Sequence, residues 1–138
     1  MINIHASCIK LKGKGVLIIG DSGSGKSDLC LRLITEFKAK LIADDRVDVQ
    51  EYKGKLIASA PKILKGLLEV RGVGIIKLPF FNSCAIDMVV NLTNNFAEIE
   101  RLPPSNFFEI YDIKVPQFNL YGKDISLPSK VIAAQSLL

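Results

Sequence analysis

The sequence predicts one domain of the α/β class, on three observations. Its 138 residues suit a single compact domain, residues 1–138, and 49% of them are apolar, enough to build a buried core. A continuous apolar run, 16–19, is followed by a glycine-rich loop and then by apolar residues at helical spacing. Further short strands separated by turns fill much of the remaining chain.

In the first half of the chain the pattern predicts a strand over 1–11, where apolar and polar residues alternate. The run 16–19 is typical of a strand buried on both faces. Apolar residues at helical spacing predict a helix over about 26–39. A short strand at 41–43 and a hairpin over 46–60 follow.

In the second half, Pro61 is expected to open a helix whose apolar face extends to Leu68. Glycines break up the segment 67–76, which we expect to form a tight loop around a short strand. A strand at 86–92 and a short terminal helix at 130–138 complete the expected elements.

Composition excludes several function classes. The net charge of +4 is modest and the lysines are spread along the chain, so we expect no nucleic-acid binding. No apolar run is long enough to cross a bilayer and no signal peptide is evident, which predicts a cytoplasmic protein without membrane contact. Cys8, Cys30 and Cys84 are far apart and form no zinc motif, so we expect buried, reduced thiols.

A complete phosphate-loop spacing, G-x-x-x-x-G-K-S, lies between the predicted strand and helix. Its residues are Gly20, Asp21, Ser22, Gly23, Ser24, Gly25, Lys26 and Ser27. Glycines let backbone N–H groups turn toward an anion, and the helix adds its positive N-terminal end. Lys26 would reach the β- and γ-phosphates of ATP and Ser27 would ligate Mg²⁺. The strand–loop–helix context argues against a chance glycine turn.

Two aspartates, Asp44 and Asp45, close the strand that follows the predicted helix. In a parallel α/β unit this position lies beside the phosphate loop, at the carboxyl edge of the sheet. One carboxylate there could take a proton from an attacking hydroxyl, while the other could hold Mg²⁺ or its water shell. The alternative is an ordinary strand-ending turn, in which aspartate is common.

Three further charged or polar positions are candidates. Glu69 and Arg71 stand within an apolar, glycine-rich stretch, where charges tend to be paired or to bind a ligand. Glu69 could complete a Mg²⁺ site and Arg71 could neutralise phosphate charge; the alternative is a Glu–Arg surface pair. His5 could reach the site if its strand pairs beside the phosphate-loop strand, although a lone histidine is more often structural.

Together these features resemble the HPr kinase/phosphorylase family, bacterial regulators that phosphorylate a serine on the phosphocarrier HPr. The resemblance rests on His5, the loop GDSGSGKS, the pair in LIADDRV and the segment LLEVRGVGII, which is similar to the family form LLEIRGLGII. It covers about residues 2–101 and corresponds to the catalytic domain. It implies a phosphate-loop kinase domain of the HPr kinase / PEP carboxykinase type, with a mixed sheet and flanking helices.

The resemblance also implies site roles. The implied catalytic set is His5, Lys26, Asp44, Asp45 and Arg101. Asp45 would accept the serine proton, while Ser27 and Glu69 would hold Mg²⁺. Arg101 is similar to a family arginine that follows tyrosine or aspartate, whereas Glu100 precedes it here.

Two departures from the family pattern bear on assembly and activity. It begins almost at the catalytic domain, so it resembles a short form without the family's N-terminal domain. The family's Pro-x-Arg-Pro-Gly-Arg segment, linked to dephosphorylation, would lie at 115–122, where this chain has no arginine. This departure puts phosphorylase activity in question.

The leading hypothesis is therefore an ATP- and Mg²⁺-dependent serine kinase acting on an HPr-like phosphocarrier of the phosphotransferase system, in the regulation of carbon and nitrogen metabolism. The family resemblance implies a homohexamer. A small-molecule kinase would need a closed acceptor pocket and lid, and no long lid segment is evident. A nucleotide sensor without catalysis would not need Lys26 together with three acidic residues.

Overall fold

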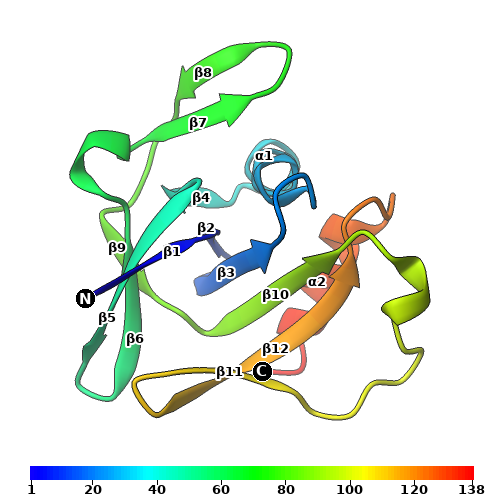
Figure 1. The fold of residues 1–138 in the computed structure, drawn as a ribbon. Coiled ribbons are helices and arrows are strands. Elements are labelled where there is room, and N and C mark those ends of the chain that lie inside the picture. Colours follow the sequence, from blue (N-terminus) through cyan, green and yellow to red (C-terminus); the bar gives the residue numbers. More distant parts are fainter.

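A computed structural model describes all 138 residues (Figure 1). The strands are β1 (Ile2–His5), β2 (Ser7–Leu11), β3 (Lys14–Gly20), β4 (Lys40–Ala43), β5 (Arg46–Tyr52), β6 (Lys55–Ser59), β7 (Leu67–Val70), β8 (Gly74–Lys77), β9 (Ser83–Ala85), β10 (Met88–Thr93), β11 (Phe107–Ile110) and β12 (Ile113–Tyr121). The helices are α1 (Lys26–Phe37) and α2 (Leu127–Gln135), with short 3₁₀ helices at Lys62–Leu64 and Phe96–Glu98.

The largest sheet has six strands in the order β11-β12-β10-β3-β2-β4. Strands β3, β10 and β12 are parallel, whereas β2 is antiparallel to its neighbours β3 and β4. Strand β4 therefore runs in the same direction as β3, with β2 between them. The prediction of an α/β fold with a mixed sheet and helices is confirmed.

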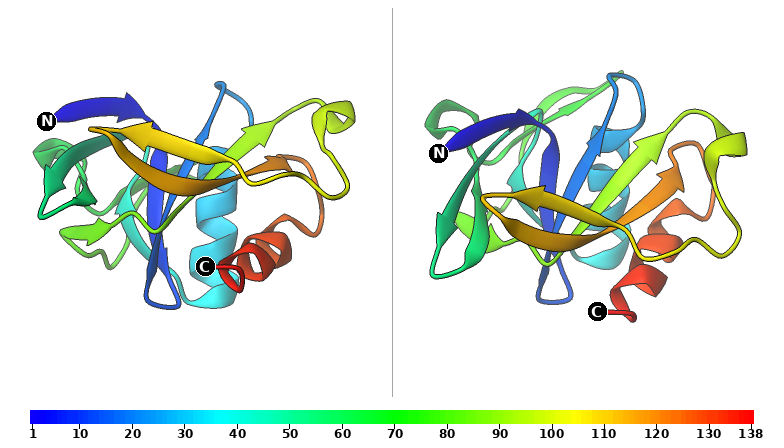
Figure 2. Two further views of the ribbon diagram at one scale, coloured as in Figure 1. Left: turned by 90° about the horizontal axis from the view of Figure 1, so that it is seen from below. Right: turned by 60° about the horizontal axis from the view of Figure 1, so that its bottom comes forward.

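Both faces of this sheet are covered, which explains the continuous apolar run in β3. Val16 and Ile18 belong to a core cluster shared with α1 and α2, while Leu17 belongs to a second cluster on the opposite face. A four-stranded antiparallel sheet, β1-β5-β6-β9, covers that second face. Figure 2 shows the two helices together on one face of the large sheet. A buried strand of this kind lacks the alternation of a half-exposed one.

The predicted first strand is broken into two. Strands β1 and β2 meet at Ala6, where the chain passes from the small sheet to the large one. The Ala6 N–H donates to the carbonyl oxygen of Asp45 at 3.2 Å instead of continuing one ladder. Strand β2 pairs with the phosphate-loop strand β3, whereas β1, which carries His5, pairs with β5.

The helix predicted from Pro61 to Leu68 is wrong. A single 3₁₀ turn, Lys62–Leu64, is followed by a two-stranded hairpin, β7–β8, in place of the predicted loop. Gly66 ends the turn with φ 73°, and a Cβ there would lie 2.7 Å from the Phe80 ring. Leu68 is fully buried against α1, so the hairpin is anchored at its base and extends from the body (Figure 1).

Two helix boundaries also differ from the prediction. Helix α1 ends at Phe37, because Lys38 adopts a left-handed conformation with φ 62° and caps the helix end. Helix α2 begins at Leu127, three residues before the expected start, with Pro128 in its first turn. No helix has the length and apolar character needed to span a membrane. All three cysteines are buried and free, as predicted.

Candidate active site

The phosphate loop joins the end of β3 to the start of α1, in the expected strand–loop–helix arrangement. Gly20, Gly23 and Gly25 have positive φ angles of 149°, 81° and 104°. A Cβ on Gly20 would lie 2.6 Å from the Ser24 hydroxyl, while one on Gly23 would meet nothing within 4 Å. Gly25 is the N-cap of α1 and no side chain caps that end, so backbone N–H groups are left for an anion. The loop therefore fits a nucleotide phosphate.

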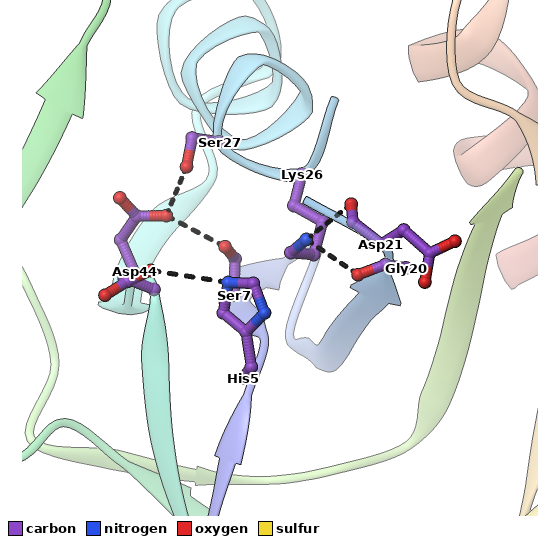
Figure 3. Close-up of polar contacts among 8 residues, drawn as sticks. His5, Ser7, Gly20, Asp21, Lys26, Ser27 and Asp44 are labelled. Atoms are coloured by element: carbon purple, nitrogen blue, oxygen red, sulfur yellow. Dashed lines mark hydrogen bonds and ion pairs between the residues drawn. The ribbon is translucent and has the colours of Figure 1, made fainter. Parts of the chain in front are cut away.

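Lys26 lies in the centre of this loop. Its Nζ donates hydrogen bonds to the carbonyl oxygens of Gly20 and Asp21, at 2.7 and 3.0 Å (Figure 3). The residue is only 7% exposed, and burial lowers the pKa of its ammonium group, against the opposing attraction of nearby aspartates. Phosphate oxygens would supply the negative charge that the buried ammonium lacks.

Asp44 connects β4 to the start of α1. One oxygen, Oδ1, accepts hydrogen bonds from the hydroxyls of Ser27 at 2.7 Å and Ser7 at 2.8 Å (Figure 3). Asp44 is 6% exposed, so its carboxylate is turned into the protein and toward the phosphate-loop serine. Ser7 was not among the predicted site residues, because a serine beginning a strand has no distinguishing pattern in sequence.

Asp45 points the other way, into the open site. The Arg46 N–H donates to the Asp44 carbonyl at 2.8 Å, which closes a γ-turn around Asp45 with φ 70°. Its carboxylate is 70% exposed and lies 3.4 Å from Nε2 of His5. The turn gives two consecutive aspartates opposite directions, one buried and one facing the pocket.

These groups surround a cavity of about 480 Å³. Its lining residues are His5, Ser7, Ser22, Gly23, Gly25, Lys26, Ser27, Asp28, Leu31, Asp45, Glu69, Val70 and Arg71. The phosphate loop and the first turn of α1 form one wall, His5 and Asp45 form another, and hairpin β7–β8 forms a third.

Glu69 and Arg71 line this cavity from the hairpin as exposed side chains, and no ion pair forms between them. The alternative of a Glu–Arg surface pair is therefore not realised. No cluster of three or more histidine, cysteine or acidic side chains forms a ready metal site. Ser27 and Glu69 nevertheless offer hard oxygen ligands to the same cavity, the type that Mg²⁺ prefers.

Arg101 lies elsewhere. It is exposed in the segment between the second 3₁₀ helix and β11, makes no ion pair, and is not a lining residue of the cavity. The structure therefore brings together the loop, His5, both aspartates and Glu69, but not this arginine.

Comparison with known proteins finds relatives that share one family name. A family model described as the HPr Serine kinase C-terminal domain matches residues 1–135. A protein named HPr kinase/phosphorylase from Lactobacillus acidophilus is 39% identical over 95% of this chain and 45% of its own length. One of the same name from Clostridium tetani is 49% identical over 55% of this chain and 25% of its own. The chain thus spans less than half the length of these relatives.

A solved structure, titled the Hpr(Ser) kinase/phosphatase from Coxiella burnetii, matches with a TM-score of 0.87 and 25% identity, covering 99% of this chain and 97% of that one. The names of these relatives combine the kinase with the reverse activity. They do not bear out the doubt about phosphorylase activity drawn from the absent arginine segment. They also give no support to a small-molecule kinase or a nucleotide sensor. The chain belongs to the HPr serine kinase C-terminal domain family.

Proposed function

We propose that this chain is an ATP- and Mg²⁺-dependent serine kinase domain that phosphorylates an HPr-like phosphocarrier of the phosphotransferase system. The observation that carries the proposal is the pocket itself: Asp45 and His5 face the phosphate loop across one cavity. A nucleotide-binding protein without transfer activity would have no use for an exposed carboxylate aimed at this position by a strained turn.

The donor side of the reaction belongs to the phosphate loop. Its backbone N–H groups and the N-terminus of α1 bind the phosphates, and Lys26 places its ammonium beside the β- and γ-phosphates. Ser27 and Glu69 would hold Mg²⁺, with Asp44 fixing the Ser27 hydroxyl from behind. When bound, Mg²⁺ supplies positive charge to the phosphate oxygens.

The acceptor side belongs to Asp45 and His5. Asp45 takes the proton from the serine hydroxyl of the phosphocarrier as that oxygen forms a bond to the γ-phosphorus and the bond to the β,γ-bridging oxygen of ATP breaks. His5, 3.4 Å away, orients this carboxylate and stabilises its charge.

The test replaces Asp45 by asparagine. Asp45→Asn should lower the rate of phosphoryl transfer by about 100- to 10,000-fold, the range for removing a general base. ATP affinity should be largely retained, because Asp45 forms no hydrogen bond or ion pair with the loop. Asp112→Asn is the matched control: Asp112 is also an exposed aspartate with positive φ, 59°, but it lies in the β11–β12 turn outside the cavity. Normal transfer by Asp45→Asn would reject it as the base.

We further propose that the protein acts in the cytoplasm, where its phosphocarrier resides, and that it forms a homo-oligomer, a hexamer by family resemblance. Exposed apolar side chains on hairpin β7–β8 support association: Val73 is 74% exposed and Ile75 is 70% exposed. Light scattering on the purified protein would measure the assembly; a monomer at micromolar concentration would contradict it.

A further inference from the structure

Asp44 is a buried carboxylate without a cationic partner. It is 6% exposed, and neither ion pair in the structure includes it. The nearby Lys26 ammonium instead donates to two loop carbonyls. A buried charge of this kind must be satisfied by hydrogen bonds. Two serine hydroxyls, from Ser7 and Ser27, donate to the same oxygen of this carboxylate.

Ser7 owes its place to the order of the strands. It is the first residue of β2, the strand that lies between phosphate-loop strand β3 and aspartate-bearing strand β4. Ser7 pairs with Ile18 on one side, and the next residue, Cys8, pairs with Ala43 on the other. Its side chain is fully buried, and Figure 3 shows its hydroxyl and that of Ser27 both directed at the same Asp44 oxygen, one from β2 and one from α1.

Both serines line the cavity, but only Ser27 belongs to the phosphate loop. Ser27 opens onto the cavity, and because its only proton is given to Asp44, its oxygen lone pairs are free for a cation. Ser7 fixes the acceptor. Without the Ser7 donor, Asp44 keeps only the Ser27 hydrogen bond and loses one of the two contacts that hold its rotamer. The acceptor of the Ser27 hydrogen bond is then fixed less firmly, so the Ser27 lone pairs are less well oriented toward the cavity.

We propose that Ser7 is a positioning residue that acts through Asp44 to orient the Ser27 hydroxyl for the divalent cation bound with ATP. This inference rests on the proposed function and deepens it. It assigns a role to a side chain outside the phosphate loop, on a strand that the loop motif does not include. Residues that hydrogen-bond a metal ligand from behind fix its orientation, and their loss typically weakens metal affinity.

The experiment measures ATP binding by calorimetry with Mg²⁺ and again in EDTA, for the wild type, Ser7→Ala and Ser7→Thr. Ser7→Ala should weaken binding with Mg²⁺ by about 10- to 100-fold, the usual effect of removing such a partner. Binding in EDTA should not change. Ser7→Thr keeps the hydroxyl and should restore the Mg²⁺-dependent part. Ser59→Ala is the control, since Ser59 is a partly buried strand serine outside the cavity.

A second readout separates positioning from folding. In the transfer assay, Ser7→Ala should need a higher Mg²⁺ concentration yet recover the wild-type kcat once Mg²⁺ is saturating. Equal weakening with Mg²⁺ and in EDTA, or no weakening, would overturn the inference while leaving the kinase proposal intact. Failure of the wild type to bind Mg²⁺ with ATP would overturn both. If Ser7→Ala does not fold, Ser7→Cys, which keeps the volume but donates weakly, gives the same comparison.

Discussion

Substituting Gly122 with alanine tests the structural account of the phosphate loop. Gly122 follows β12 and packs directly under the loop, where its N–H donates to the Thr93 carbonyl at 2.9 Å. A Cβ at this position would lie 1.9 Å from the backbone carbonyl oxygen of Ser24. Neither atom belongs to a flexible side chain, so the clash can be relieved only by moving backbone.

The size of that movement follows from the distances. Real Cβ atoms keep at least 3.0 Å from other heavy atoms, so the 1.9 Å contact must open by about 1.1 Å, the difference between the two values. Misplacing a binding group by about 1 Å can cost about 100-fold in rate. Overpacking of this kind also destabilises a fold by about 1–3 kcal/mol. Gly122→Ala should therefore lower both stability and phosphoryl transfer.

Gly15→Ala provides a control that creates a similar clash between the new Cβ and a backbone carbonyl oxygen. A Cβ on Gly15 would lie 1.8 Å from the Ala85 carbonyl oxygen, at the opposite end of β3 from the loop. Gly20 lies five residues further along β3 than Gly15, a distance of about 17 Å. Urea unfolding should show a comparable loss of stability in both variants, whereas calorimetry at low temperature should show weakened ATP binding only in Gly122→Ala. Wild-type ATP affinity in a folded Gly122→Ala protein would refute the reasoning.

Asp45→Gly should abolish transfer yet raise the free energy of unfolding by about 0.5–1 kcal/mol, because glycine relieves the positive φ; a destabilised variant in urea unfolding would contradict this. Burial lowers the pKa of Lys26, and phosphate would raise it again. ATP binding at alkaline pH should therefore take up protons, measured by calorimetry in buffers of different ionisation enthalpy; no uptake would contradict this. A hydrogen bond between the Cys8 and Cys84 thiols, whose sulfur atoms lie 3.9 Å apart, lowers the pKa of Cys84, while the pKa values of Cys8 and Cys30 are raised, so mass spectrometry should find Cys84 alkylated first.

The parts of the fold that sequence predicts well are those with strong local patterns. The apolar run of β3, the glycine spacing and the helical repeat of α1 each constrain the backbone locally, and the structure follows them. The sequence after Pro61 does not distinguish a helix from a hairpin, because its leucines suit a helix face as well as alternate strand positions. The hairpin is stabilised over the helix by tertiary packing, of Leu68 on α1 and of Gly66 against Phe80.

In the site, too, the residues with a local sequence pattern are predicted well and those placed by long-range contacts are not. The loop and the aspartates could be placed from sequence, because the carboxyl ends of β3 and β4 point the same way. The position of β2 between β3 and β4 could not be predicted from sequence, because the pairing of an antiparallel strand with its neighbours depends on long-range contacts. Ser7 was missed for that reason, and Arg101, chosen by resemblance, lies outside the cavity because its loop has no local pattern that fixes its course.

Transfer of the γ-phosphoryl group from labelled ATP to a purified HPr-like phosphocarrier tests the central claim most directly. Wild-type protein with Mg²⁺ should place the label on one serine of the phosphocarrier, identified by mass spectrometry. The label should disappear when that serine is replaced by alanine or when the enzyme carries Asp45→Asn. Nucleotide binding without label on the phosphocarrier, or turnover with a small metabolite instead, would contradict the assignment of this domain as a protein-serine kinase.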